Sequence, residues 1–67
     1  MEQITDQMMN VAVVTYAFEM LERGMTATQA KGLRVLQITE GINNIADKVY
    51  VRSLEKVIEI LERPIFV

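Results

Sequence analysis

The feature that most limits this chain is its lack of cross-links: its 67 residues include no cysteine and no histidine. A domain of roughly 60 residues buries only about 60% of its unfolded surface, so small domains often depend on disulfides, metals or association. Without cysteine there is no disulfide, and without both residue types the common zinc sites are excluded. Association therefore remains as the way to add stability beyond the packing of the chain itself.

The first apolar segment predicts a helix over residues 3–23. Asp6 stands in its first turn, where negative charge suits the helix dipole, and Gly24 follows at the usual position of a left-handed stop. Because 51% of the residues are hydrophobic and 24% are charged, the chain has a globular composition. We expect one all-α domain over residues 1–67.

A second helix is predicted over residues 27–50. The Thr26–Gln29 spacing is that of a capping box, which satisfies backbone donors at a helix start. The 3-4-3-4 spacing of an apolar seam favours a helix that continues past Gly41, because one internal glycine costs only about 1 kcal/mol. The seam consists of Val35, Ile38, Ile42, Ile45 and Val49.

A short third helix is predicted over residues 54–63, with Ser53 as its N-cap and Pro64 after its end. Its apolar stripe has the i, i+3, i+4, i+7 spacing of Leu54, Val57, Ile58 and Leu61. We expect the apolar tail, residues 64–67, to fold back over the core. The predicted fold is a small three-helix bundle in the order helix, long helix, short helix.

The first predicted helix is apolar on nearly all sides, which is typical of a helix that is buried all round. A 67-residue monomer has too few other elements to surround it. We therefore expect a homodimer or higher oligomer. The interface residues predicted on the first helix and on the seam are Val11, Val14, Phe18, Val35, Ile38, Ile42, Ile45 and Val49.

Charge is distributed unevenly along a chain whose net charge is −2. Every charged side chain before Arg23 is acidic, whereas basic residues predominate from Arg23 to Arg52. One interpretation is that the acidic first helix pairs with the basic second helix. The other is a basic edge for an acidic partner, with candidate anion or nucleic-acid contacts at Lys31, Arg34, Lys48 and Arg52.

Few residues in the chain can support catalysis. There is no histidine or thiol for a nucleophilic triad, and no glycine-rich phosphate loop. The pairs Glu19/Glu22 and Glu59/Glu62 resemble the E-x-x-E motif of helical nucleotide pyrophosphohydrolases, which implies Mg²⁺ binding. The next motif of that family is not matched, since Asn43 follows Glu40 where an acid is expected. We expect no enzyme activity, no metal and no cofactor.

Binding to another protein, as a small regulator or inhibitor, is the function we predict. An alternative rests on Gly24-Met25-Thr26 and Ser53-Leu54-Glu55, which resemble the ends of the recognition unit in helix-turn-helix repressors of the Cro type. This resemblance implies that the four basic candidates contact phosphates and bases. A further alternative is an oligomer that holds a small anionic ligand at its interface, through Arg34, Tyr50 and Arg52.

The start of the sequence also bears on location. Met1-Glu2-Gln3 lacks the basic region of a signal peptide, and the apolar run 8–21 is shorter than the roughly 20 residues that span a bilayer. We expect a cytoplasmic protein with no membrane partner, or one in the host cytoplasm if it is virally encoded.

Overall fold

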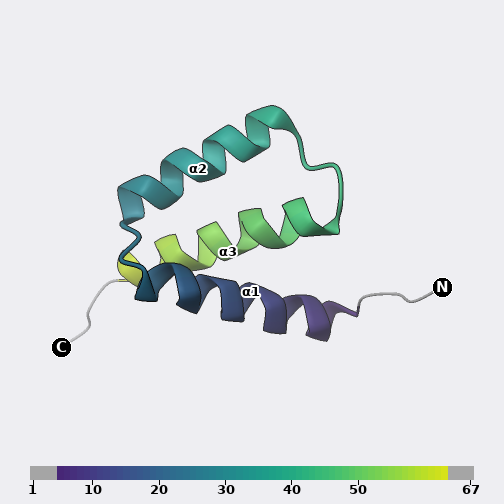
Figure 1. Ribbon diagram of the computed structural model, residues 1–67, viewed down its shortest axis with the longest axis horizontal. Helices are drawn as coiled ribbons and strands as arrows, with labels where there is room; N and C mark the ends of the chain where they lie inside the picture. The colour runs from purple at the N-terminus through teal and green to yellow at the C-terminus, as the bar shows by residue number, and fades with distance from the viewer. Residues whose placement is uncertain (1–4, 64–67) are drawn as a thin grey trace.

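Three helices make up the part of the chain that the structure, a computed structural model, describes, which is residues 5–63. They are α1 (Asp6–Glu22), α2 (Ala27–Glu40) and α3 (Ile45–Leu61), and no strand occurs among residues 5–63 (Figure 1). The predicted all-α class and the number of helices are confirmed. The apolar tail, residues 64–67, lies outside the described residues.

The two ends of α1 are set by local chemistry. Thr5 is its N-cap, because the Thr5 hydroxyl accepts a hydrogen bond from the Met8 N–H, so the predicted start at residue 3 is wrong. At the other end Gly24 has φ +82°, and the Met25 N–H donates to the Met20 carbonyl. This is the Schellman pattern that a left-handed glycine permits, and it confirms the predicted stop.

The start of α2 is as predicted but its end is not. Thr26 and Gln29 form both hydrogen bonds of the capping box. The helix then ends at Glu40, because Gly41 has φ +109° and ψ 149°. This positive-φ conformation favours glycine and is incompatible with a helix. The prediction of one helix over 27–50, with a continuous seam through Gly41, is therefore wrong.

Helix α3 begins nine residues earlier than predicted. Asn44 is its N-cap and accepts from the Asp47 N–H, and the Asp47 carboxylate accepts from the Asn43 N–H. Ser53 is not a cap: it is fully buried inside α3 and donates its hydroxyl to the Val49 carbonyl. The predicted short helix 54–63 is thus wrong, since α3 has 17 residues and α2 has 14.

Helix α3 is the centre of the molecule. It packs against α1 and against α2, whereas the backbones of α1 and α2 do not come within contact distance of each other. Helices α1 and α3 run in the same direction and α2 runs opposite to both (Figure 1). One core cluster joins all three helices (Ala17, Ala30, Leu54, Val57), and a second joins α1 to α3 (Met9, Val13, Val49).

This arrangement leaves much apolar surface exposed among the described residues. In a closed three-helix bundle each helix packs against both of the other helices. Here α1 and α2 each pack mainly against α3. The large hydrophobic side chains that stay exposed are Met8, Val11, Val14, Tyr16, Phe18, Val35, Leu36, Ile38, Ile42, Ile45, Ile60 and Leu61. None of the described helices combines the length and the apolar content needed to cross a bilayer.

Candidate protein-binding surfaces

Two adjoining open hollows lie along α3, and together we call them the α3 groove. One lies between the end of α1, α2 and Tyr50 of α3, and the other lies between α1 and the first half of α3. The first has a volume of about 750 Å³ and the second of about 460 Å³, and they share Met20 and Tyr50. All three helices line it, chiefly through Ala12, Tyr16 and Met20 of α1, Ile45, Ala46, Val49 and Tyr50 of α3, and Gly32, Leu33 and Leu36 of α2. Its lining is mostly apolar.

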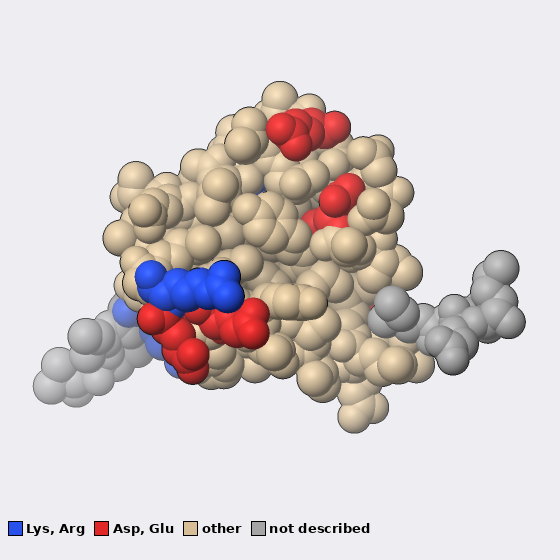
Figure 2. Space-filling model, viewed as in Figure 1, with Lys and Arg blue, Asp and Glu red and all other residues tan. Residues whose placement is uncertain are grey.

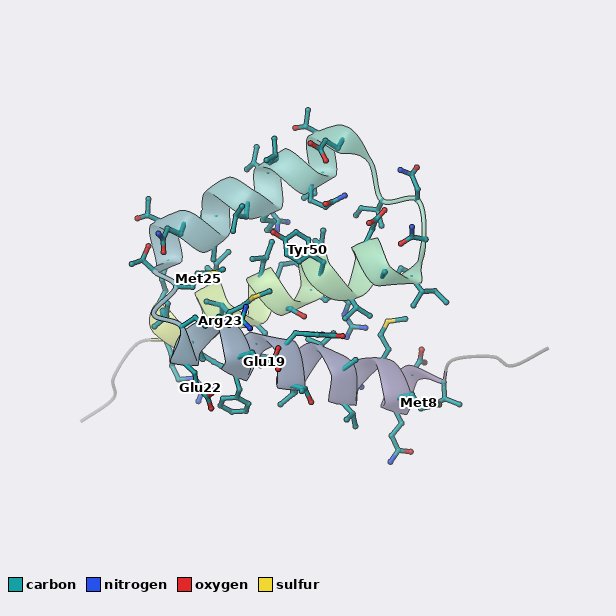
Figure 3. The ribbon with its side chains drawn as sticks, in the orientation of Figure 1. Met8, Glu19, Glu22, Arg23, Met25 and Tyr50 are labelled. Carbon is teal, nitrogen blue, oxygen red and sulfur yellow. The ribbon has the colours of Figure 1, made fainter. Side chains whose placement is uncertain are left out.

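Tyr50 and Met25 mark the middle and one end of this groove. In Figure 3 Tyr50 lies on α3 between the two flanking helices, and Met25 lies where the α1–α2 connection closes the groove. Both side chains are half-buried against the core cluster of Ala17, Ala30, Leu54 and Val57. Packing against the core therefore holds these two side chains in place, and only their outward surfaces are open to a ligand.

Gly32 is an unexpected residue in the wall of the groove. It stands in the middle of α2, where a glycine costs about 1 kcal/mol relative to alanine. A Cβ built on Gly32 would meet nothing within 4 Å, and its φ is not in the left-handed region. Neither packing inside the described chain nor backbone conformation accounts for a glycine at this position.

Charged side chains surround the groove rather than line its floor. Figure 2 shows a largely uncharged face, on which a basic group lies directly against acidic groups and further acidic groups lie elsewhere. Glu19, Glu22 and Arg23 lie at the junction of α1 with α2 (Figure 3), and Arg23 lines that end of the groove. At the opposite end α2 finishes with Glu40 and α3 carries Asp47 in its first turn. The charged side chain that lines the groove is thus Arg23, and acidic groups lie beyond both of its ends.

The outward side of α1 forms a second apolar surface, which we call the α1 outer face. Val11, Val14 and Phe18 follow the i, i+3, i+7 spacing that places side chains on one side of a helix. Their exposed fractions are 63%, 41% and 55%, whereas Val13 and Ala17 on the inward side are buried. The structure therefore brings these three predicted interface residues together on one exposed face.

The five residues of the predicted seam do not share one face. Val35 and Ile38 are exposed on α2, Ile42 is exposed in the connection, and Ile45 is exposed at the start of α3. Val49 is buried against α1 in the core cluster with Met9 and Val13. The break at Gly41 redirects the chain, so the 3-4-3-4 spacing no longer corresponds to one helical stripe.

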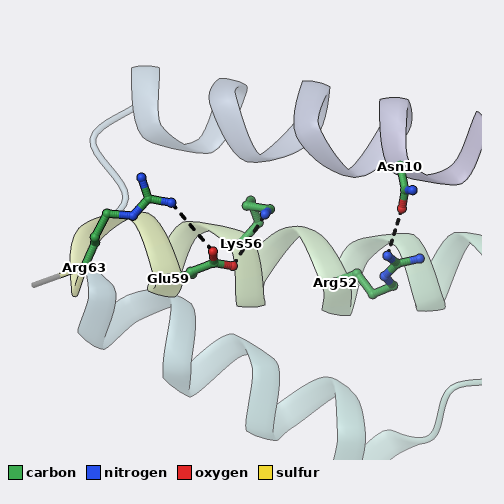
Figure 4. Close-up of polar contacts among 5 residues, drawn as sticks. All are labelled: Asn10, Arg52, Lys56, Glu59 and Arg63. Atoms are coloured by element: carbon green, nitrogen blue, oxygen red, sulfur yellow. Dashed lines mark hydrogen bonds and ion pairs between the residues drawn. The ribbon is translucent and has the colours of Figure 1, made fainter. Parts of the chain in front are cut away.

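Three of the four predicted cationic contacts have partners within the chain. Arg34 donates to Glu55 at 2.9 Å, Lys31 pairs with Glu62, and Arg52 donates to Asn10 of α1 at 2.9 Å (Figure 4). The pairs between α2 and α3 replace the predicted pairing of the first helix with the second. Arg34, Arg52 and Lys48 line one open hollow of about 450 Å³, which shares no lining residue with the α3 groove.

The two acid pairs lie apart. Glu59 faces Lys56 and Arg63, with N–O distances of 3.4 and 3.8 Å (Figure 4), and Glu62 pairs with Lys31 of α2. Glu19 and Glu22 lie on α1 beside Arg23 (Figure 3). Within residues 5–63 no group of three or more acidic side chains has the arrangement needed to hold a metal ion.

Sequence reasoning found the α1 outer face but missed most of the α3 groove. Of the groove residues, only Ile45 and Val49 were predicted at an interface, and Tyr50 was predicted only as a contact for a small anion. Gly32 and Ala46 carried a usable signal, because small residues in the exposed part of a helix permit close approach of another helix. Comparison with known proteins gives no further guide, since no family model, curated protein or solved structure matches this chain.

Proposed function

We propose that this chain is a non-catalytic helical module that binds an amphipathic helix of a partner protein in the α3 groove. The observation that carries the proposal is the open, mostly apolar groove itself, which α3 floors and α1 and α2 flank. A fourth helix laid on α3 would cover surfaces from all three helices. Grooves of this form take amphipathic helices through anchors spaced at i, i+3, i+4 and i+7. A module that covers a partner's helix in this way acts as a small regulator or inhibitor.

The α1 outer face supports self-association as the second part of the proposal. Three exposed apolar side chains, Val11, Val14 and Phe18, form a small patch, whereas each partner contributes roughly 800 Å² to a standard interface. We therefore expect a weak dimer that dissociates on dilution. Because the α1 outer face and the α3 groove are different surfaces, self-association through the outer face leaves the groove open for the partner.

Binding of a neutral helical peptide tests the proposed function. The probe is a synthetic amphipathic helix about four turns long, with a Leu/Ala face and uncharged Gln flanks, followed by fluorescence anisotropy. We expect saturable binding that Ala46→Arg removes, because Ala46 is exposed on α3 and lines the groove. Gln7→Arg, which adds the same side chain at an exposed position of α1 outside the groove, is the matched control. No binding, or equal binding to both variants, contradicts the proposal.

A further inference from the structure

The charges around the α3 groove restrict what kind of helix it can take. Glu19 and Glu22 lie beyond one end, beside Arg23, which is the charged side chain that lines the groove, and Glu40 and Asp47 lie beyond the other end. Unlike charges attract across a groove within the Debye length of roughly 8–10 Å, and like charges there oppose binding. The groove therefore favours a ligand with an apolar centre and basic flanks.

The same charges disfavour a second copy of the chain as the occupant. Two copies placed groove to groove would bring the acidic surroundings of one against those of the other. The predominantly acidic α1, with Asp6, Glu19 and Glu22, would also enter an acidic environment if it lay in the groove of a neighbour. Both arrangements bring like charges together, which favours a different protein as the partner.

Gly32 is an independent indication that another helix lies against this wall. The residue weakens α2, it has no neighbour within 4 Å of a built Cβ, and it lines the groove. Small residues at a helix crossing permit two backbones to approach closely. A partner helix that crosses α2 at this position accounts for a glycine that the described chain does not otherwise need.

We propose that the α3 groove selects a basic amphipathic helix of another protein, which crosses α2 at Gly32 and places its Lys or Arg flanks beside Glu19, Glu22, Glu40 and Asp47. This inference rests on the proposed function and adds the chemical class of the partner. The apolar face of the partner helix covers Tyr50 and Met20, and its basic flanks provide the discrimination against other amphipathic helices.

Two synthetic peptides that differ only in their flanks test the inference. Both are helices about four turns long with the same Leu/Ala face, and one carries Lys flanks where the other carries Glu flanks. By fluorescence anisotropy at low salt, we expect the Lys peptide to bind at least about tenfold more tightly, with a preference that shrinks as salt rises. The double variant Glu19→Lys with Glu40→Lys reverses two exposed charges near helix C-termini. It should reduce the ratio of the two affinities, Lys peptide over Glu peptide, several-fold.

The possible outcomes separate the inference from the proposed function. Equal binding of the two peptides, or tighter binding of the Glu peptide, overturns the inference, while loss of binding in Ala46→Arg but not in Gln7→Arg keeps the groove as a helix site. Failure of both peptides and of the neutral peptide to bind overturns the proposed function as well. A preference for the Lys peptide that the Glu19→Lys/Glu40→Lys variant leaves unchanged also contradicts the inference, because the selecting charges then lie elsewhere.

Discussion

Helices α1 and α3 have the same length, 17 residues, but they use their apolar side chains in different ways. In α3 most apolar residues fall on the sides that face α1 and α2, so Val49, Leu54 and Val57 are buried. The exposed ones, Ile45, Ile60 and Leu61, lie near its ends. In α1 they are spread around the helix, so Val13 is buried while Val11 and Val14 are exposed. The comparison shows that spacing, rather than hydrophobic content, decides how much of a helix a small fold can bury.

The apolar residues that the fold leaves exposed provide both proposed binding surfaces, the α1 outer face and the α3 groove. Exposed apolar groups of this kind are costly in water unless another surface covers them, and clustered ones mark interaction sites. Substitutions at buried and exposed positions test this contrast between α3 and the surfaces around it.

Leu54→Ala should destabilise the fold more than any substitution at an exposed apolar position. Leu54 is 0% exposed at the centre of α3, so the change leaves a cavity and costs about 3 kcal/mol of unfolding free energy. Leu36→Ala is the same chemical change at a position 55% exposed in the groove wall, and it should cost less than about 1 kcal/mol. Urea denaturation measures both. Equal costs would contradict the assignment of α3 as the core helix.

Phe18→Glu should weaken self-association at least about tenfold, which corresponds to about 1.4 kcal/mol. Phe18 is exposed on the α1 outer face, so the folded monomer should keep its helix content. Val14→Glu should act in the same way, and Ile60→Glu on α3 is the matched control. Light scattering over a dilution series measures the change. A folded Phe18→Glu protein with unchanged association would show that this face is not the interface.

Asn44→Ala and Ser53→Ala distinguish the observed start of α3 from the predicted one. Asn44 caps the helix, so its loss should cost about 1 kcal/mol. Ser53 only bonds the carbonyl of Val49 within its own helix, so its replacement should change stability by less than about 0.5 kcal/mol. Thermal unfolding of the two variants provides the measurement. A larger loss in Ser53→Ala would support the short helix that the sequence predicted.

Gly32→Ala should stabilise the free chain by about 0.5–1 kcal/mol, because alanine favours a helix and its Cβ would meet nothing within 4 Å. The same variant should bind the Lys peptide less tightly than the unchanged chain, since the added methyl group keeps the partner helix farther from α2. Urea denaturation measures the stability of the variant, and fluorescence anisotropy measures its affinity for the Lys peptide. Destabilisation, or unchanged binding, would show that Gly32 is not a point of close approach.

The sequence was a good guide to local structure wherever a strong terminating or capping signal was present. The Thr26–Gln29 capping box and the stop at Gly24 were predicted and are observed. The break at Gly41 was missed because the apolar spacing from Val35 to Val49 was given more weight than Gly41 and the capping residue Asn44. Ser53 was misassigned for the same reason, since a serine inside a helix and one at its start look alike without the preceding boundary.

The candidate site could be predicted only in part. The α1 outer face follows directly from helical spacing within one segment, so Val11, Val14 and Phe18 were found. The α3 groove depends on the position of α2 relative to α1, which is set by the turn at Gly41 and by packing of Ala30 against Leu54. No pattern within one segment contains that information, so Gly32 and Ala46 can be noticed in the sequence as small residues on helices, but their position in a groove cannot be predicted.

Mapping the Lys peptide onto the protein by nuclear magnetic resonance tests the central claim most directly. The backbone amide shifts of the chain are followed as the peptide is added, with Phe18→Glu used to keep the protein monomeric. We expect the largest changes at Gly32, Ala46 and Tyr50 in the α3 groove, with little change at Val11 and Val14 on the α1 outer face. Changes centred on the α1 outer face, or spread evenly over all three helices, would contradict the groove as the binding site.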